Sequence, residues 1–199
     1  MRRILILILL ALMGWWVYSV TRPTRYPPGV LIKGDPVQTL VASDQLEPWP
    51  HGVYMVRPLA RYDIQARLLS RKSYSSDEIA DLCPVDFAVG WGPMSDQAVL
   101  DRLSVWQTGR FFFWEYQNPP PIPKEEIISH ASNMHLIPSS AAIETALKTV
   151  RTGNLFRLRG TLVEATRAGL GPVRSSLSRT DTAKGACEVM WVESVEILR

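Results

Sequence analysis

A run of seventeen residues without a charged side chain, residues 4–20, constrains this chain more than any other feature. At 1.5 Å per residue, a helix of this length is about 26 Å long, close to the ~30 Å hydrocarbon core of a bilayer. The side chains expected at the membrane–water interface are three aromatics and two arginines: Trp15, Trp16, Tyr18, Arg22 and Arg25. The run predicts one transmembrane helix, with residues 1–25 as a membrane anchor.

A cleaved secretory signal is the main alternative, because Met1-Arg2-Arg3 resembles the charged start of a signal peptide. Cleavage requires small residues near the cut, and the run instead ends in bulky aromatics with no Ala-x-Ala pattern. A buried core helix is disfavoured because the run has no polar face. We therefore expect an uncleaved anchor, and leave cleavage open.

Positive charge does not decide the orientation, since two arginines lie on each side of the run. Export of a long domain behind a short N-terminal tail predicts a cytoplasmic N-terminus. The expected location is therefore the inner (plasma) membrane, crossed once, with the domain in the periplasm.

The net charge of +3 belongs to the anchor rather than to the domain. All 19 acidic residues follow residue 25, while four of the 22 basic residues flank the run. Residues 26–199 thus carry 18 basic and 19 acidic residues, a net charge of −1. A nucleic-acid-binding domain is expected to be basic in its own right, so nucleic acid is disfavoured as a partner.

The remaining chain has the length of one domain. Residues 26–36 are rich in proline and glycine and predict an extended tether, followed by a single globular domain over residues 37–199. The predicted helices cover residues 77–82, 96–103 and 139–151, and the predicted strands cover residues 62–68, 85–91, 104–107, 110–116, 155–166 and 187–198. This pattern indicates an α+β domain with a mostly antiparallel sheet.

A glycine interrupts the β pattern of residues 153–163. Such a glycine is typical of a strand that bends at a barrel corner. An OB-like small barrel in residues 130–199 is therefore one expected arrangement.

Three stretches resemble a family of uncharacterised bacterial proteins that have an N-terminal membrane segment. They are residues 89–96, residues 130–138, and residues 175–182 followed by 185–188. In that family a glycine commonly follows the Asp-Thr pair, where this chain has Ala183. The resemblance implies an anchored domain and carries no activity, cofactor or catalytic residue.

Two histidines, His130 and His135, suggest a metal site together with Cys187, Asp181 or Glu188. Two ligands on one helix face need a spacing of four residues, and a strand places residues five apart on opposite faces. Histidines bonded to nearby backbone are therefore favoured over ligands, although a loop can still join them.

A serine nucleophile is a second possibility, with Ser176 attacking, His135 as base and Asp181 as its orienting partner. No Gly-x-Ser-x-Gly or Ser-x-x-Lys pattern supports it, so exposed strand serines are favoured. The candidate polar cluster comprises His130, His135, Ser176, Arg179 and Asp181. No phosphate loop or dinucleotide fingerprint is present, so no cofactor is predicted.

The two cysteines, Cys83 and Cys187, both belong to the domain expected outside the cytoplasm. An oxidising compartment permits a disulfide between them. The alternative is two buried thiols, because Cys187 alternates with Val189 and Trp191 on an expected core face.

The sequence favours a membrane-anchored extracytoplasmic binding or assembly domain without a catalytic site. Its expected partner is an envelope protein, a lipid headgroup or a glycan, the last two contacted by a basic strip that contains Arg157, Arg159, Arg174 and Arg179. A solvated sheet face is the plainer interpretation of that strip. The alternative function is an envelope hydrolase that uses polar residues near His130, His135, Ser176 and Asp181.

Overall fold

The computed structural model describes residues 6, 8–10, 12–15, 22–42, 47–178 and 186–198. The described residues between 6 and 15 are helical, and Trp15 is exposed. Within the described residues, no helix has the length and apolar character needed to cross a bilayer. Trp16, Tyr18 and much of the uncharged run lie outside them.

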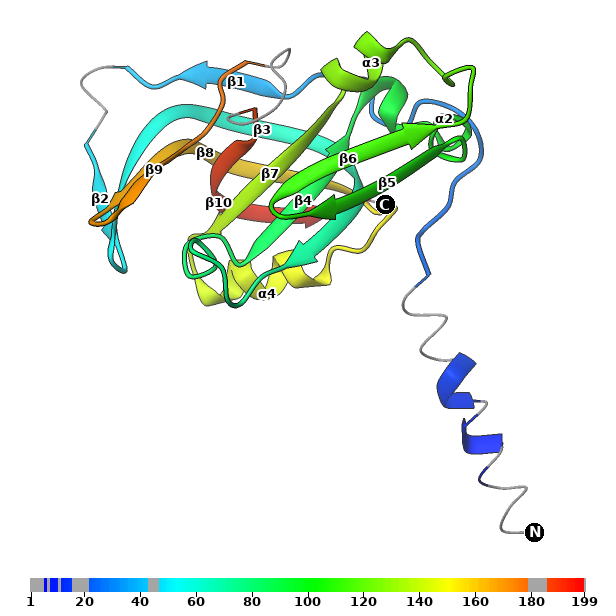
Figure 1. The fold of residues 1–199 in the computed structure, drawn as a ribbon, viewed down its shortest axis with the longest axis horizontal. Helices are drawn as coiled ribbons and strands as arrows, with labels where there is room; N and C mark the ends of the chain where they lie inside the picture. Colours follow the sequence, from blue (N-terminus) through cyan, green and yellow to red (C-terminus); the bar gives the residue numbers. More distant parts are fainter. Residues whose placement is uncertain are drawn as a thin grey trace.

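The domain is a mixed α+β structure built mainly from strands (Figure 1). The strands are β1 (Val37–Leu40), β2 (Trp49–His51), β3 (Tyr54–Ser73), β4 (Val85–Gly90), β5 (Leu103–Thr108), β6 (Phe111–Tyr116), β7 (Ala131–Pro138), β8 (Leu155–Arg167), β9 (Leu170–Arg174) and β10 (Glu188–Ile197). The helices are the 3-10 helix η2 (Gly92–Ser95), α2 (Gln97–Leu100), α3 (Lys124–Ser129) and α4 (Ala141–Thr149). The expected α+β class and largely antiparallel sheet are confirmed.

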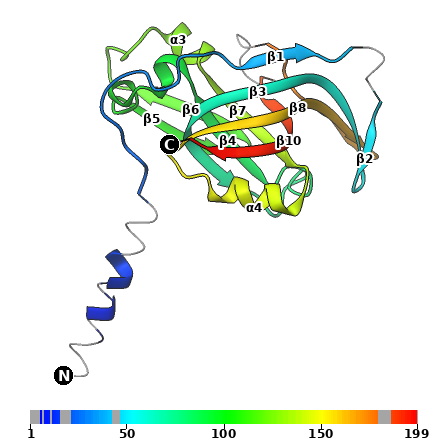
Figure 2. The ribbon, with the colours of Figure 1, turned by 180° about the vertical axis from the view of Figure 1, so that it is seen from behind.

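Five strands of the large sheet pair in a closed cycle: β3 with β4, β4 with β7, β7 with β10, β10 with β8, and β8 with β3. Only β7 and β10 are parallel among these pairs. The long strand β3 closes the cycle because residues 55–67 pair with β8 and residues 67–73 with β4. Figure 2 shows β3, β8 and β10 side by side at the back of this barrel.

One glycine allows the strands to approach closely. Gly160 in β8 pairs with Tyr62 on one side and with Val192 on the other. A Cβ atom at Gly160 would overlap the carbonyl oxygen of Trp191, so a larger residue cannot be accommodated without moving backbone. The glycine that interrupts the β pattern is therefore required by packing.

The barrel interior is filled by alternate residues of the strands. Phe87 in β4, Met134 in β7 and Phe156 in β8 are fully buried there, and the rings of Phe87 and Phe156 meet edge to face at 5.5 Å. Helix α4 adds Leu147 to the same core. It begins at Ser140, whose hydroxyl accepts a hydrogen bond from the Ile143 amide at 3.3 Å.

The hairpin of β5 and β6 covers the outer face of β4 and β7 (Figure 1). Its inner side chains, including Phe112 and Trp114, pack on a second cluster that contains Ala88 and Ile127. The strands of the barrel thus have apolar side chains on the inside and a covered, partly polar face under the hairpin.

Two short segments differ from the sequence prediction. Residues 77–82 form turns rather than a helix, because the Asp77 carboxylate caps the Ile79 amide at 3.1 Å and also binds Arg110. The helix expected at residues 96–103 is limited to α2, and its N-cap is Asp96 rather than Ser95. The Ser95 hydroxyl instead accepts bonds from the backbone of residues 31 and 32.

The segment expected as a tether is bonded to the domain. Buried Arg67 donates to the carbonyl oxygens of Ser95, at 3.1 Å, and of Thr24, at 3.2 Å. The Trp91 indole donates to Asp35 at 3.0 Å, and Ile32 is buried in the main core. The sequence predicted that the domain starts at Val37, but residues before Val37 already belong to it.

Candidate functional site

Polar side chains gather on the outer face of the barrel, under the hairpin. In the register of the sheet, Asp86 of β4 lies opposite His135 of β7, and His135 lies beside Val189 of β10. Because side chains alternate along a strand, Asn133 and Cys187, each two residues earlier, share this face. Strand pairing thus brings together residues that are distant in the sequence.

Asp86 and His135 form a buried ion pair. The Asp86 carboxylate is completely buried, and its Oδ2 lies 3.0 Å from His135 Nδ1, in an ion pair rather than an aligned hydrogen bond. Burial alone lowers the pKa of His135, but the neighbouring Asp86 carboxylate and Cys187 thiol raise that pKa to about 9. His135 is therefore an imidazolium at neutral pH.

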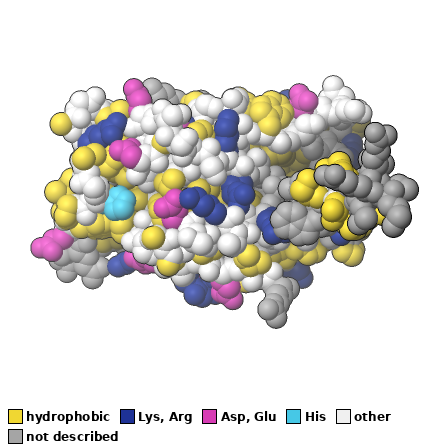
Figure 3. Space-filling model, turned by 90° about the horizontal axis from the view of Figure 1, so that it is seen from below, with side chains coloured by type: hydrophobic (Ala, Val, Ile, Leu, Met, Phe, Trp, Pro, Cys, Tyr) yellow, Lys and Arg dark blue, Asp and Glu magenta, His cyan; other side chains and the backbone are white. Residues whose placement is uncertain are grey.

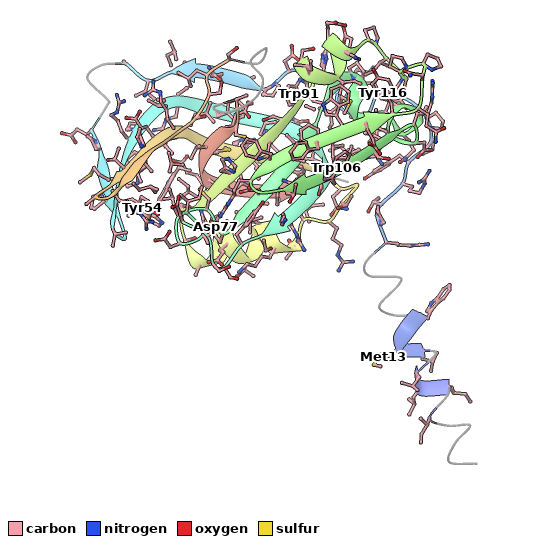
Figure 4. The ribbon with its side chains drawn as sticks, in the orientation of Figure 1. Met13, Tyr54, Asp77, Trp91, Trp106 and Tyr116 are labelled. Atoms are coloured by element: carbon pink, nitrogen blue, oxygen red, sulfur yellow. The ribbon has the colours of Figure 1, made fainter. Side chains whose placement is uncertain are left out.

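Arg110 fixes the other side of the Asp86 carboxylate. Its Nη1 donates to Asp86 Oδ1 and to the Cys83 carbonyl oxygen, both at 2.8 Å, and its Nη2 donates to Asp77 at 2.7 Å. The guanidinium also stacks on the Tyr74 ring at 3.6 Å. Figure 4 places Asp77 beside the turn of the hairpin and Tyr116 at its far end.

The backbone of Arg110 adopts a left-handed conformation with φ of 70°, next to Gly109 with φ of 55°. This is the pair of positive φ angles that a tight two-residue hairpin turn requires. For a residue other than glycine the conformation costs about 1–2 kcal/mol. The hydrogen bonds of the Arg110 side chain offset that cost. The turn in this conformation directs the guanidinium at Asp86.

The thiol of Cys187 lies beside an oriented amide. Asn133 Nδ2 is 3.6 Å from Cys187 Sγ and donates to the Arg110 carbonyl oxygen at 3.0 Å. Asn133 Oδ1 accepts from Gln107 Nε2 at 2.7 Å, which fixes the direction of the amide. The Ser176 amide donates to the Cys187 carbonyl oxygen at 3.0 Å, so the start of β10 is also held.

Cys187 opens onto a cavity of about 280 Å³. The cavity lies between β6, α3 and the start of β7, and its wall is mainly apolar. The lining residues are Phe111, Phe112, Phe113, Trp114, Ile127, Ile128, Ala131, Ser132, Asn133, Ala186 and Cys187. Among the described residues, no charged side chain lines this cavity.

A thiol, an imidazole and a carboxylate on one face are the groups that nucleophilic catalysis by cysteine needs. The imidazole exchanges a proton with the thiol, and the carboxylate orients the ring and balances its charge. The cavity beside the thiol provides space for a substrate. The arrangement is chemically able to form and break a thioester.

The sequence-predicted polar cluster is only partly brought together. His135 is central, and Ser176 contacts the site through its backbone. His130 instead ends α3, where its Nδ1 lies 3.0 Å from the Glu126 carbonyl oxygen. Arg179 and Asp181 lie outside the described residues. Ser175 and Ser176 are buried, which corrects their interpretation as exposed strand residues, whereas Ser178 is exposed as expected.

Neither a metal site nor a disulfide is formed by the described residues. They contain no group of three or more His, Cys, Asp and Glu side chains that could hold a metal ion. Both cysteines are free thiols, and they do not form a pair capable of a disulfide. Cys83 is fully buried, and burial raises the pKa of its thiol.

The three described arginines of the expected basic strip are engaged in ion pairs. Arg157 donates to Asp63 at 2.7 Å, Arg159 contacts the same carboxylate, and Arg174 binds Glu164. The hydrogen bonds from Arg157 and Arg159 lower the pKa of the Asp63 carboxyl group. On the face in Figure 3, basic and acidic side chains are interleaved. The described part of the strip is thus a neutralised surface rather than an anion-binding strip.

Sequence reasoning missed Asp86, Arg110 and Asn133, and gave Cys187 another role. The available signal was alternation: Asp86 interrupts a fully buried strand, and Asn133 and His135 alternate with Met134 and Leu136. A charged residue in such a strand needs a buried partner, and this requirement indicated a polar site. Comparison with protein-family models, curated proteins and solved structures finds no match for this chain.

Proposed function

We propose that the domain is a thiol-dependent hydrolase in which Cys187 attacks an acyl carbonyl group. The observation that supports this proposal is that Cys187, which lines an apolar cavity, shares one face of the sheet with the ion pair of His135 and Asp86. The sequence favoured a non-enzymatic domain because it contains no catalytic signature motif. The convergence of Cys187, His135 and Asp86 is the reason for preferring an enzyme.

In the proposed reaction, the thiol proton of Cys187 already resides on the His135 imidazolium, and the Cys187 thiolate adds to the carbonyl carbon. The leaving group departs with the proton from His135, and a thioester between Cys187 and the acyl group remains. Water, deprotonated by His135, then adds to the thioester and releases a carboxylic acid and the free thiol. Asp86 stays ionised throughout and balances the imidazolium.

The proposed positioning residues are Arg110 and Asn133. Arg110 holds the carboxylate oxygen that His135 does not use. Asn133 directs one amide hydrogen at the sulfur, where it also stabilises negative charge that develops beside it. Neither residue forms or breaks a bond to the substrate.

The test is turnover of p-nitrophenyl esters by the full-length protein. Cys187→Ala is expected to abolish acyl-enzyme chemistry, and His135→Gln to lower kcat/KM by about 10²–10⁴-fold, the usual contribution of a general base. Cys83→Ala serves as the matched control, because that thiol is buried away from the cavity. Turnover that persists unchanged in Cys187→Ala would refute the proposal.

The barrel itself supports a ligand-binding role. We propose that it is OB-like, because five strands pair in a closed cycle and α4 lies between the third and fourth of them. It draws on β3 and β4 and is therefore not confined to residues 130–199, as the sequence suggested. OB-type barrels bind ligands on the face of their second and third strands, which correspond here to β4 and β7.

The proposed location is outside the cytoplasm, with the domain attached to the inner membrane. The uncharged run at residues 4–20 and the resemblance to anchored bacterial proteins support this proposal. Alkaline phosphatase and a cytoplasmic reporter, each fused after the last residue, test it. Phosphatase activity is expected, and reporter activity without phosphatase activity would place the domain inside.

A binding or assembly role is the second candidate function. It is favoured by the outer face of the hairpin, where Trp106, Phe111 and Phe113 are each about 40% exposed and Trp106 stacks on Phe113 at 5.7 Å. Such an aromatic patch suits an envelope protein, lipid or glycan as partner. Capture of a partner that survives Cys187→Ser but is lost in Trp106→Ser would favour this role over hydrolysis.

A further inference from the structure

The cavity beside Cys187 provides information about the substrate, on the condition that the proposed thiol chemistry is correct. Cys187 is part of the cavity wall, so an acyl carbonyl attacked by its sulfur has the rest of the acyl group inside or at the mouth of the cavity. The wall chemistry therefore selects the acyl group.

Most of this wall is hydrocarbon. It is lined by residues 111–114 of β6, of which Phe112 and Trp114 direct their side chains inward, and by Ile127 and Ile128 of α3. Burying apolar atoms against such a surface is favourable by about 25 cal/mol per Å², whereas burying an unpaired charge is strongly unfavourable.

The few polar groups of the wall already have partners within the protein. The Ser132 hydroxyl donates to Glu188, and the Asn133 amide is bonded to Gln107 and to the Arg110 backbone. No described lining residue is charged, so a carboxylate or ammonium on the acyl group would meet no counter-ion among the described residues of the wall. The wall accepts an uncharged, apolar group.

We infer that the substrate is an ester, thioester or amide of a short- to medium-chain aliphatic acid, whose chain occupies the cavity between β6 and α3. The volume of about 280 Å³ is at the lower limit of small-molecule sites, which excludes long fatty chains from complete burial. Each methylene that enters the cavity is worth about 0.8 kcal/mol, or roughly a fourfold change in the rate constant.

The test measures alkylation of Cys187 in the full-length protein by N-ethyl-, N-butyl- and N-hexylmaleimide. Rates are normalised to the unfolded protein, and mass spectrometry locates the label. We expect the normalised rate to rise by roughly fourfold per methylene until the cavity is filled, and a maleimide with a carboxylate-bearing chain to react at least tenfold more slowly than its uncharged analogue.

Ile128→Trp is expected to remove the chain-length dependence by filling the cavity. Ile122→Ala is the matched control, because Ile122 packs in the same apolar cluster but does not line the cavity. Equal rates for all chain lengths, or for charged and uncharged chains, would overturn the inference. Ester turnover is measured separately, so chain-length dependence without turnover would refute the proposed hydrolase and leave the acyl-chain site supported.

Discussion

The ion pair between Asp86 and His135 should make the stability of the domain depend on pH. The pKa of His135 is raised from the ordinary 6.5 to about 9 when the protein folds. Because this pKa is higher in the folded state, the protonated ring stabilises the fold fully below about pH 6.5, and this contribution is lost as the pH rises through about 9. Each tenfold change in proton affinity is worth about 1.4 kcal/mol, so the contribution is about 3 kcal/mol.

Asp86→Asn removes the charge that raises the pKa of His135, and burial then lowers that pKa. The difference in unfolding free energy between the wild type and this variant should therefore shrink by up to ~3 kcal/mol between pH 6 and pH 10, which is about 6–12 °C in Tm for a domain of this size. Urea unfolding of both proteins at four pH values measures this difference in unfolding free energy.

Asp77→Asn is the matched control, because it removes the other carboxylate bound to Arg110 without an ion pair to His135. Its stability should stay nearly parallel to that of the wild type across this pH range. A constant difference between the wild type and Asp86→Asn at all four pH values would refute the assigned role of the ion pair.

Three other predictions concern the fold. Gly160→Ala should destabilise the domain by about 1–3 kcal/mol in urea unfolding, because its Cβ meets neighbouring backbone, whereas Gly171→Ala, which faces open space, should change it little. Ser140→Ala should cost about 1 kcal/mol through loss of the N-cap of α4, with Ser139→Ala as a control that leaves the cap intact. Arg67→Ala should speed tryptic cleavage of residues 22–35 in a timed digest, because Arg67 bonds that segment to the domain; an unchanged rate would contradict this.

The sequence was sufficient to predict the elements that depend on local pattern. Alternation predicted β10, and the pair of β runs around residue 109 predicted the hairpin. The helix expected at residues 77–82 is absent because Asp77, which was expected as a first-turn acid, is used to bind Arg110. The position of an acidic residue in an expected first turn therefore does not reveal whether its carboxylate has a stronger partner elsewhere.

The candidate site required the pairing of strands, which periodicity does not determine. The parallel pairing of β7 with β10 places Cys187 beside Asn133, and the antiparallel pairing of β4 with β7 places Asp86 opposite His135. A register shift of one residue would turn these side chains into the barrel interior. Residue types alone suggested a site that contains His130 and His135, but the chain uses His130 to end a helix.

The most direct test of the central claim is trapping of the acyl-enzyme. Full-length protein is mixed with p-nitrophenyl butyrate, quenched in acid and digested, and the peptide that contains Cys187 is analysed by mass spectrometry. A butyryl thioester on Cys187 that hydroxylamine removes, and that is strongly reduced in folded His135→Gln, is predicted. No adduct on Cys187, or an equal adduct in His135→Gln, would contradict the role of this thiol and its imidazole.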